Sequence, residues 1–227
     1  MNLIEKRLAE LASLPAVTPG DRIELTPDWK LISGKNSHSV FKAFWEQGYK
    51  KVTNPETVLF SAAGEKEDYL LTFCKDSGIS LIDCEPEDYF CKAGIKQDSA
   101  VLAGINQQIK QMGGSGSIPI VISPAAMADC LATSSFSMVI PDTIYIELIG
   151  AANQQYSGEA LCSYLLETFH DSLIGNAVIL GGALLEQLTK QERRNLSHFI
   201  PLSGAAVGVL SADGPLGQVE SVIKIKL

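Results

Sequence analysis

The sequence has few charged, aromatic and histidine residues. Charged residues make up 19% of its 227 positions and aromatic residues 7%, and His38, His170 and His198 are its three histidines. Acidic side chains outnumber basic ones by 26 to 18, which gives a net charge of −8. A nucleic-acid-binding protein needs a basic surface to neutralise phosphates, so this balance argues against that class.

Long apolar runs are also missing, and so is an even set of cysteines. No run of eighteen apolar residues occurs, so no membrane span is expected. Residues 1–7 lack the apolar region of a signal peptide. The five cysteines are spread from Cys74 to Cys162, which is unlike a secreted disulfide scaffold. We therefore expect a reduced, cytoplasmic protein that does not associate with membranes, and its hydrophobic content of 46% favours a packed core.

Apolar periodicity predicts alternating helices and strands, which is typical of the α/β class. Helices are expected over residues 3–12, 39–48, 68–75, 100–112, 124–132 and 157–169, and from residue 190 onward. Strands are expected over residues 22–25, 57–60, 78–83, 118–122, 143–148, 205–210 and 219–225. Ser123, Ser157 and Thr189 are predicted N-caps, and Glu192 completes a capping box with Thr189.

A glycine–serine run over residues 113–117 is predicted to be a flexible joint. It divides the chain into a first subdomain, residues 1–113, and a second, residues 118–227. The run could also hold a phosphate, because glycines let backbone N–H groups approach an anion. It lacks the Lys-Ser/Thr ending of a P-loop and precedes a strand, so the joint is the favoured interpretation.

No side-chain pattern identifies a catalytic or metal site. Cys84 and Cys91 are too far apart for a typical zinc or iron–sulfur pair, and no second pair accompanies them. His198 follows Arg193 and Arg194 on a predicted helix, where these residues could form either a solvated face or an anion pocket.

The order of several short motifs resembles a known family over nearly the whole chain. These motifs are Glu5-Lys6, Pro19-Gly20-Asp21, residues 51–56, residues 139–150, residues 157–160 and residues 204–213. In this order and spacing they are similar to the N-terminal half of aconitase-type hydro-lyases, in particular the large subunit of isopropylmalate isomerase. The resemblance implies a three-layer α/β/α, aconitase-like fold.

The family's functional residues are replaced in this sequence. The resemblance places the family's Asp-His pair on Ala62 and Ala63, and one of its histidines on Gln97. It places the family's Asn-Met pair on His198 and Phe199 and a family glutamate on Leu202, while Pro124 to Met127 stand in place of an Asp-Ser-His-Thr motif. The family's cluster-binding cysteines fall beyond residue 227. We therefore expect no catalytic residues, no bound metal and no 4Fe-4S cluster in this chain, and we expect apolar replacements to fill the old cleft.

Three functional hypotheses follow. The favoured one is a non-catalytic, truncated hydro-lyase homologue that acts as an interaction or regulatory component and could form a homo-oligomer. The second is a subunit of a split hydro-lyase that a cluster-bearing partner chain completes. The third is a binder of di- or tricarboxylic acids, with Arg193, Arg194 and His198 as anion contacts, because arginine binds carboxylates through two parallel hydrogen bonds.

Overall fold

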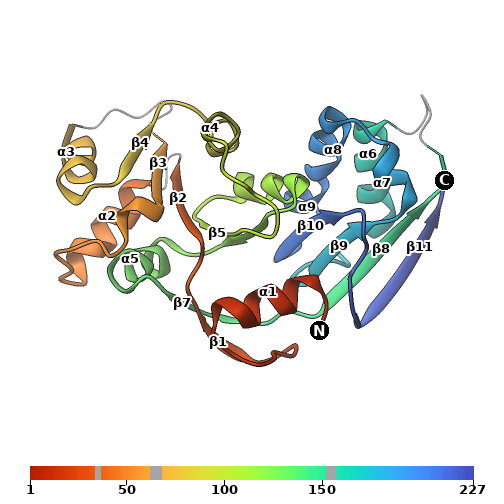
Figure 1. The fold of residues 1–227 in the computed structure, drawn as a ribbon, viewed down its shortest axis with the longest axis horizontal. Coiled ribbons are helices and arrows are strands. Elements are labelled where there is room, and N and C mark those ends of the chain that lie inside the picture. The colour runs from red at the N-terminus through yellow and green to blue at the C-terminus, as the bar shows by residue number, and fades with distance from the viewer. Residues whose placement is uncertain (34–36, 62–67, 152–156) are drawn as a thin grey trace.

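The computed structural model describes residues 1–33, 37–61, 68–151 and 157–227. Within these residues, helices and parallel strands alternate along the chain, so the predicted α/β class is confirmed (Figure 1). None of the helices in these ranges is long and apolar enough to cross a membrane.

The first sheet has five parallel strands in the order β4-β3-β2-β5-β6. Its strands are β2 (Trp29–Ser33), β3 (Val58–Ser61), β4 (Ser80–Ile82), β5 (Val101–Gly104) and β6 (Ile118–Val121). The helical segments of this part are α2 (Ser37–Glu46), η1 (Pro55–Thr57), α3 (Asp68–Ser77), α4 (Pro86–Ala93), η2 (Gln107–Ser115) and α5 (Pro124–Thr133). Ser123 caps α5 through its side chain as predicted, with Pro124 in the first turn.

The second sheet has four parallel strands in the order β10-β9-β8-β11. Its strands are β8 (Thr143–Ile149), β9 (Ala177–Gly181), β10 (Val207–Ser211) and β11 (Ser221–Lys226). Its helices are α6 (Gly158–Phe169), α7 (Ala183–Gln187), α8 (Lys190–Ser197) and α9 (Phe199–Leu202). Ser157 caps α6 and Thr189 forms the predicted capping box of α8.

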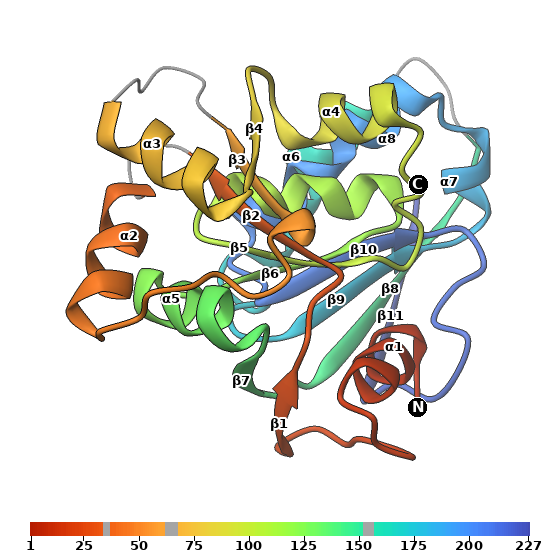
Figure 2. The same ribbon diagram turned by 60° about the vertical axis from the view of Figure 1, so that its left-hand side comes forward.

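The two sheets share a core instead of being separated by a mobile joint. Strands β6 and β10 lie side by side where the sheets meet (Figure 2). One cluster of buried apolar side chains includes Ile118 and Ile120 of the first sheet and Ile179 and Val209 of the second. The antiparallel pair β1 (Arg22–Leu25) and β7 (Phe136–Val139) and the helix α1 (Leu3–Leu11) complete the fold.

Helix α1 forms hydrogen bonds with both parts of the molecule. The backbone N–H of Leu3 donates to the carbonyl of Pro215, 2.8 Å away, just before β11. On the other side, Arg7 Nε donates to the carbonyl of Ser99 at 3.0 Å, and its guanidinium binds Asp28 at 2.9 Å. These contacts connect Ser99 and Pro215 to the same helix.

The predicted helix over residues 100–112 is wrong. Its first part is strand β5, in which all four residues are buried, and its second part belongs to the 3-10 helix η2. A strand that is covered on both faces shows a continuous apolar run, and such a run cannot be distinguished from a buried helix by periodicity. Strands β2, β7 and β9 and helix α4 were not predicted at all.

The glycine–serine run is packed and not flexible. Residues 113–115 end η2, and Gly113 is buried against β10, where an added Cβ would lie 3.1 Å from the carbonyl carbon of Gly208. The predicted flexible joint is therefore wrong, because glycine is needed here for a close backbone approach. The division into residues 1–113 and 118–227 stays a prediction, and β6 is hydrogen-bonded to β5 across that boundary.

Candidate functional site

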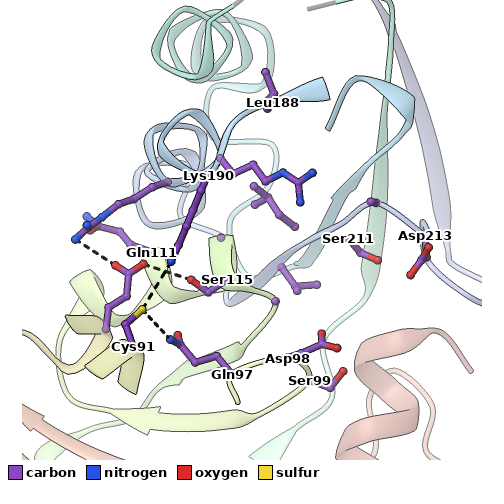
Figure 3. A pocket seen from close by; sticks show the side chains of 18 of the residues that line it. Cys91, Gln97, Asp98, Ser99, Gln111, Ser115, Leu188, Lys190, Ser211 and Asp213 are labelled. Carbon is purple, nitrogen blue, oxygen red and sulfur yellow. Dashed lines mark hydrogen bonds and ion pairs between the residues drawn. The ribbon is translucent and has the colours of Figure 1, made fainter. Parts of the chain in front are cut away.

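A cleft opens between α4 and η2 of the first part of the chain and α8 and β10 of the second. Its volume is about 1080 Å³, and both parts of the chain line it (Figure 3). A smaller cavity of about 170 Å³ adjoins it at the carboxyl ends of β2 and β5 and shares Glu87, Gln111 and Arg194 with it. Polar and charged side chains dominate the lining of the cleft: Glu87, Asp88, Cys91, Gln97, Asp98, Ser99, Gln111, Ser115, Lys190, Gln191, Arg193, Arg194, Ser211 and Asp213.

Helix α8 supplies the cationic wall of the cleft. Lys190, Arg193 and Arg194 follow the i, i+3, i+4 spacing that places side chains on one helix face. The capping box fixes the start of this helix, since Thr189 Oγ1 accepts from the N–H of Glu192 at 3.2 Å and Glu192 accepts from the N–H of Thr189 at 2.8 Å. The hydrogen bonds from the Thr189 side chain and backbone lower the pKa of Glu192.

One ion pair connects the cationic wall to the first part of the chain. Arg194 Nη2 lies 3.2 Å from Glu87 Oε2, and the Glu87 side chain is only 15% exposed. Ser115 Oγ donates to the other carboxylate oxygen of Glu87 at 3.3 Å. Glu87 therefore pairs with Arg194, whereas Lys190 and Arg193 of this wall form no ion pair with another described residue.

Cys91 lies between donors from both parts of the chain. Lys190 Nζ is 3.8 Å and Gln97 Nε2 is 3.9 Å from Cys91 Sγ, and Figure 3 shows the two donors converging on the sulfur. Cys91 is the only exposed cysteine of the five. Cys74 and Cys130 are buried, and burial raises the pKa of each thiol to about 12.

Two buried polar atoms in the lining have no hydrogen-bond partner within the described residues. They are the donor Arg193 Nε and the acceptor Gln97 Oε1. A buried polar atom without a partner is costly, and native proteins satisfy almost all such atoms with protein, water or ligand. The cleft thus contains one donor that needs an acceptor and one acceptor that needs a donor.

Two of the three predicted ligand-binding residues line the cleft. Arg193 and Arg194 line it, and His198 does not. His198 is exposed at the end of α8, with its Nδ1 3.4 Å from Gln111 Nε2. A ligand-binding role for Arg193 and Arg194 stays a prediction. Lys190 was not among the predicted residues, although its spacing from Arg193 on a capped helix was a usable signal.

The positions at which the resemblance expects functional residues are scattered. Gln97 lines the cleft, whereas Phe199 is buried in the core of the second sheet and Leu202 is 65% exposed. Ala62 and Ala63 lie outside the described residues. Phe199 and Leu202 do not line this cleft, and the expectation that apolar replacements fill the family's old cleft stays a prediction.

The donor set does not fit a metal centre. No group of three or more His, Cys, Asp or Glu side chains in the described ranges could hold a metal ion. A 4Fe-4S cluster takes several cysteine thiolates at one place. Here Cys74, Cys130 and Cys162 are buried in three different helices, so the cysteines of this chain do not form such a set.

Comparison with known proteins supports the predicted resemblance. No protein-family model matches the chain. It is 23% identical, over 92% of its length, to 54% of the probable methanogen homoaconitase large subunit of Methanothermobacter thermautotrophicus. It is 23% identical, over 94% of its length, to 54% of the 3-isopropylmalate dehydratase large subunit of Moorella thermoacetica.

A fungal relative shows the same partial coverage. The chain is 20% identical, over 95% of its length, to 32% of the mitochondrial homoaconitase of Cryptococcus neoformans. The chain thus spans about half the length, or less, of the curated relatives that it matches. The predicted resemblance to the aconitase-type hydro-lyases is confirmed, and the coverage fits one half of those enzymes.

Proposed function

We propose that this protein is a non-catalytic relative of the aconitase-type hydro-lyases that binds a small carboxylate-bearing molecule in the cleft between its two sheets. A ligand in this cleft contacts both parts of the chain, so its binding could control an interaction with another protein or a regulatory role. The observation that carries the proposal is Arg193, whose buried Nε has no partner among the described residues at the wall of the cleft.

The chemistry of the cationic wall favours a carboxylate. A guanidinium presents parallel N–H donors that match the two oxygens of a carboxylate, and Lys190 adds a second positive charge one helical turn away. A bound carboxylate would accept the hydrogen bond that Arg193 Nε lacks.

Several positions support a role without catalysis. Removal and return of water need an acid/base group and, in this family, a metal that polarises the substrate. Gln97 stands where the resemblance expects a histidine, and an amide cannot take up or release a proton near neutral pH. The side chains at Phe199 and Leu202 are equally unable to do so, and the five cysteines are dispersed.

The substitution Arg193→Gln tests ligand binding in the cleft. We expect citrate and succinate to raise the melting temperature of the wild type and to bind it measurably by calorimetry. Loss of a charge-assisted hydrogen bond, about 1.5–3 kcal/mol, should weaken binding by Arg193→Gln roughly 10- to 150-fold.

Arg22→Gln is the matched control, since Arg22 is exposed on β1 and does not line the cleft. Equal affinities of the wild type and Arg193→Gln would contradict the assignment of Arg193. Failure of every carboxylate to bind would contradict the binding proposal itself. A stoichiometric iron content together with hydratase activity of the purified protein would contradict the non-catalytic role.

The relatives favour a second candidate, a partner chain. Two of the relatives are named large subunits, and this chain matches only about half of each. Under this alternative a cluster-bearing hydro-lyase chain assembles with this one. Anaerobic co-purification of such a chain in equal stoichiometry would support it, and recovery of the protein alone would contradict it. Five free thiols are consistent with the proposed cytoplasmic location for either candidate.

A further inference from the structure

We propose that the cleft selects an amino acid, a ligand with an ammonium group as well as carboxylate, over a di- or tricarboxylic acid without an amine. This inference rests on the proposed function and specifies its ligand class. It follows from the distribution of charge over the two sides of the cleft.

The cleft carries more negative than positive side chains. Its lining contains four carboxylates, on Glu87, Asp88, Asp98 and Asp213, against the three cations of α8. The pair between Glu87 and Arg194 neutralises one of each sign. Three carboxylates then face two cations, so a ligand with two or three negative charges and no positive charge meets repulsion as well as attraction.

Two of the three remaining carboxylates, those of Asp98 and Asp213, lie away from the cations of α8. The cations come from one helix, whereas Asp98 follows α4 and Asp213 follows β10. Figure 3 shows Lys190 on one side of the cleft and Asp98 and Asp213 away from it, next to Ser99 and Ser211. Within the described part of the chain, neither aspartate carboxylate has a hydrogen bond or an ion pair.

Arg193 Nε and Gln97 Oε1, the two atoms without a partner in the described residues, favour the same kind of ligand. Arg193 Nε needs an acceptor, which a carboxylate provides, and Gln97 Oε1 needs a donor, which an ammonium provides. A hydroxyl group could also donate to Gln97. Only a cationic donor is complemented by Asp98 and Asp213 as well, so the charges of the cleft decide between a hydroxy acid and an amino acid.

The protein offers a built-in reporter of cleft occupancy. Cys91 lines the cleft and is the only exposed thiol of the five. A molecule bound next to Lys190 and Gln97 should therefore slow alkylation of Cys91. This readout is independent of the heat of binding and needs no engineered label.

The experiment compares matched ligand pairs on the full-length wild type. L-Glutamate is titrated against glutarate, and L-aspartate against succinate, with calorimetry and the rate of Cys91 alkylation by iodoacetamide as readouts. A single charge-assisted hydrogen bond of about 1.5 kcal/mol corresponds to roughly tenfold in affinity. We expect at least one amino acid to bind about tenfold more tightly than its deaminated counterpart and to slow alkylation of Cys91.

Variants of the acidic side identify the source of this preference. The double variant Asp98→Asn/Asp213→Asn should bring the amino acid and its counterpart to within about threefold of each other. Asp76→Asn is the matched control, because Asp76 is exposed on α3 and does not line the cleft. If the double variant unfolds, each single variant should still reduce the preference.

The possible outcomes separate this inference from the proposed function. Equal or tighter binding of glutarate and succinate would overturn the amino-acid preference and leave carboxylate binding in place. No binding of any of the four acids or of citrate would overturn both. A preference that survives in Asp98→Asn/Asp213→Asn would overturn the role of the acidic side.

Discussion

Gly113 is the position at which the sequence and the structure predict opposite effects of one substitution. If residues 113–117 were a flexible joint, Gly113→Ala would reduce the entropy of the unfolded chain and stabilise the protein by about 0.4–1 kcal/mol. In the structure, the added Cβ overlaps the carbonyl oxygen of Gly208 and lies 3.0 Å from Ile200 Cδ1. Ordinary van der Waals contact begins at 3.4 Å, so β10 or η2 must move.

The change in the free energy of unfolding caused by this movement follows from two known effects. Overpacking a well-packed interior costs about 1–3 kcal/mol. Subtracting the entropic gain leaves a destabilisation of roughly 1.3 kcal/mol for Gly113→Ala. For a protein of this size, that corresponds to a fall in melting temperature of about 3–5 °C.

Urea unfolding followed by circular dichroism measures this change directly. Ser115→Ala is the control in the same segment, because Ser115 loses only its 3.3 Å hydrogen bond to Glu87 and adds no atom. We expect the free energy of unfolding to decrease clearly less in Ser115→Ala than in Gly113→Ala. Unchanged or increased stability of Gly113→Ala would refute the packing of η2 against β10 and would restore the flexible joint.

Two further predictions concern the first sheet. Lys30 is 1% exposed and donates to Thr57 Oγ1 at 2.8 Å, and burial lowers its pKa, so Lys30→Met should stabilise the protein at neutral pH by about 1–3 kcal/mol. Since the Lys30 side chain binds its proton more tightly in the unfolded chain, wild-type stability should rise as the pH increases from the folded pKa toward 10.5. Unfolding measured across alkaline pH should show a smaller rise for Lys30→Met. An identical pH profile for the two proteins would contradict the burial of the ammonium. Ser123→Ala removes the 3.1 Å hydrogen bond to the N–H of Ala126 and should cost about 1 kcal/mol in urea unfolding, whereas no loss would argue against this cap.

Local signals in the sequence were sufficient for the helix starts and for many strands. Ser123, Ser157 and Thr189 cap helices as predicted, because a side-chain oxygen satisfies the free N–H groups of the first turn wherever the helix lies in the fold. Strand β1 has the predicted bounds, Arg22–Leu25.

Long-range packing decided the segments that were predicted wrongly. Residues 101–104 form a strand because β2 and β6 flank them; β2 lies far away in the sequence, and η2 separates β6 from them. Gly113 is buried because Gly208, 95 residues later, lies against it. The apolar periodicity of one segment contains no information on neighbours that are distant in the sequence.

The candidate site shows the same division. The sequence by itself determined where α8 begins, because a capping box satisfies the N–H groups of the first turn, and it placed Arg193 and Arg194 on this helix. It also determined, through the motif order, the resemblance to one half of the aconitase-type hydro-lyases. Only the tertiary structure brought Gln97, Asp98 and Asp213 to the same cleft, since two separate connections deliver them there and the meeting of two sheets sets their distance from Lys190 and Arg193.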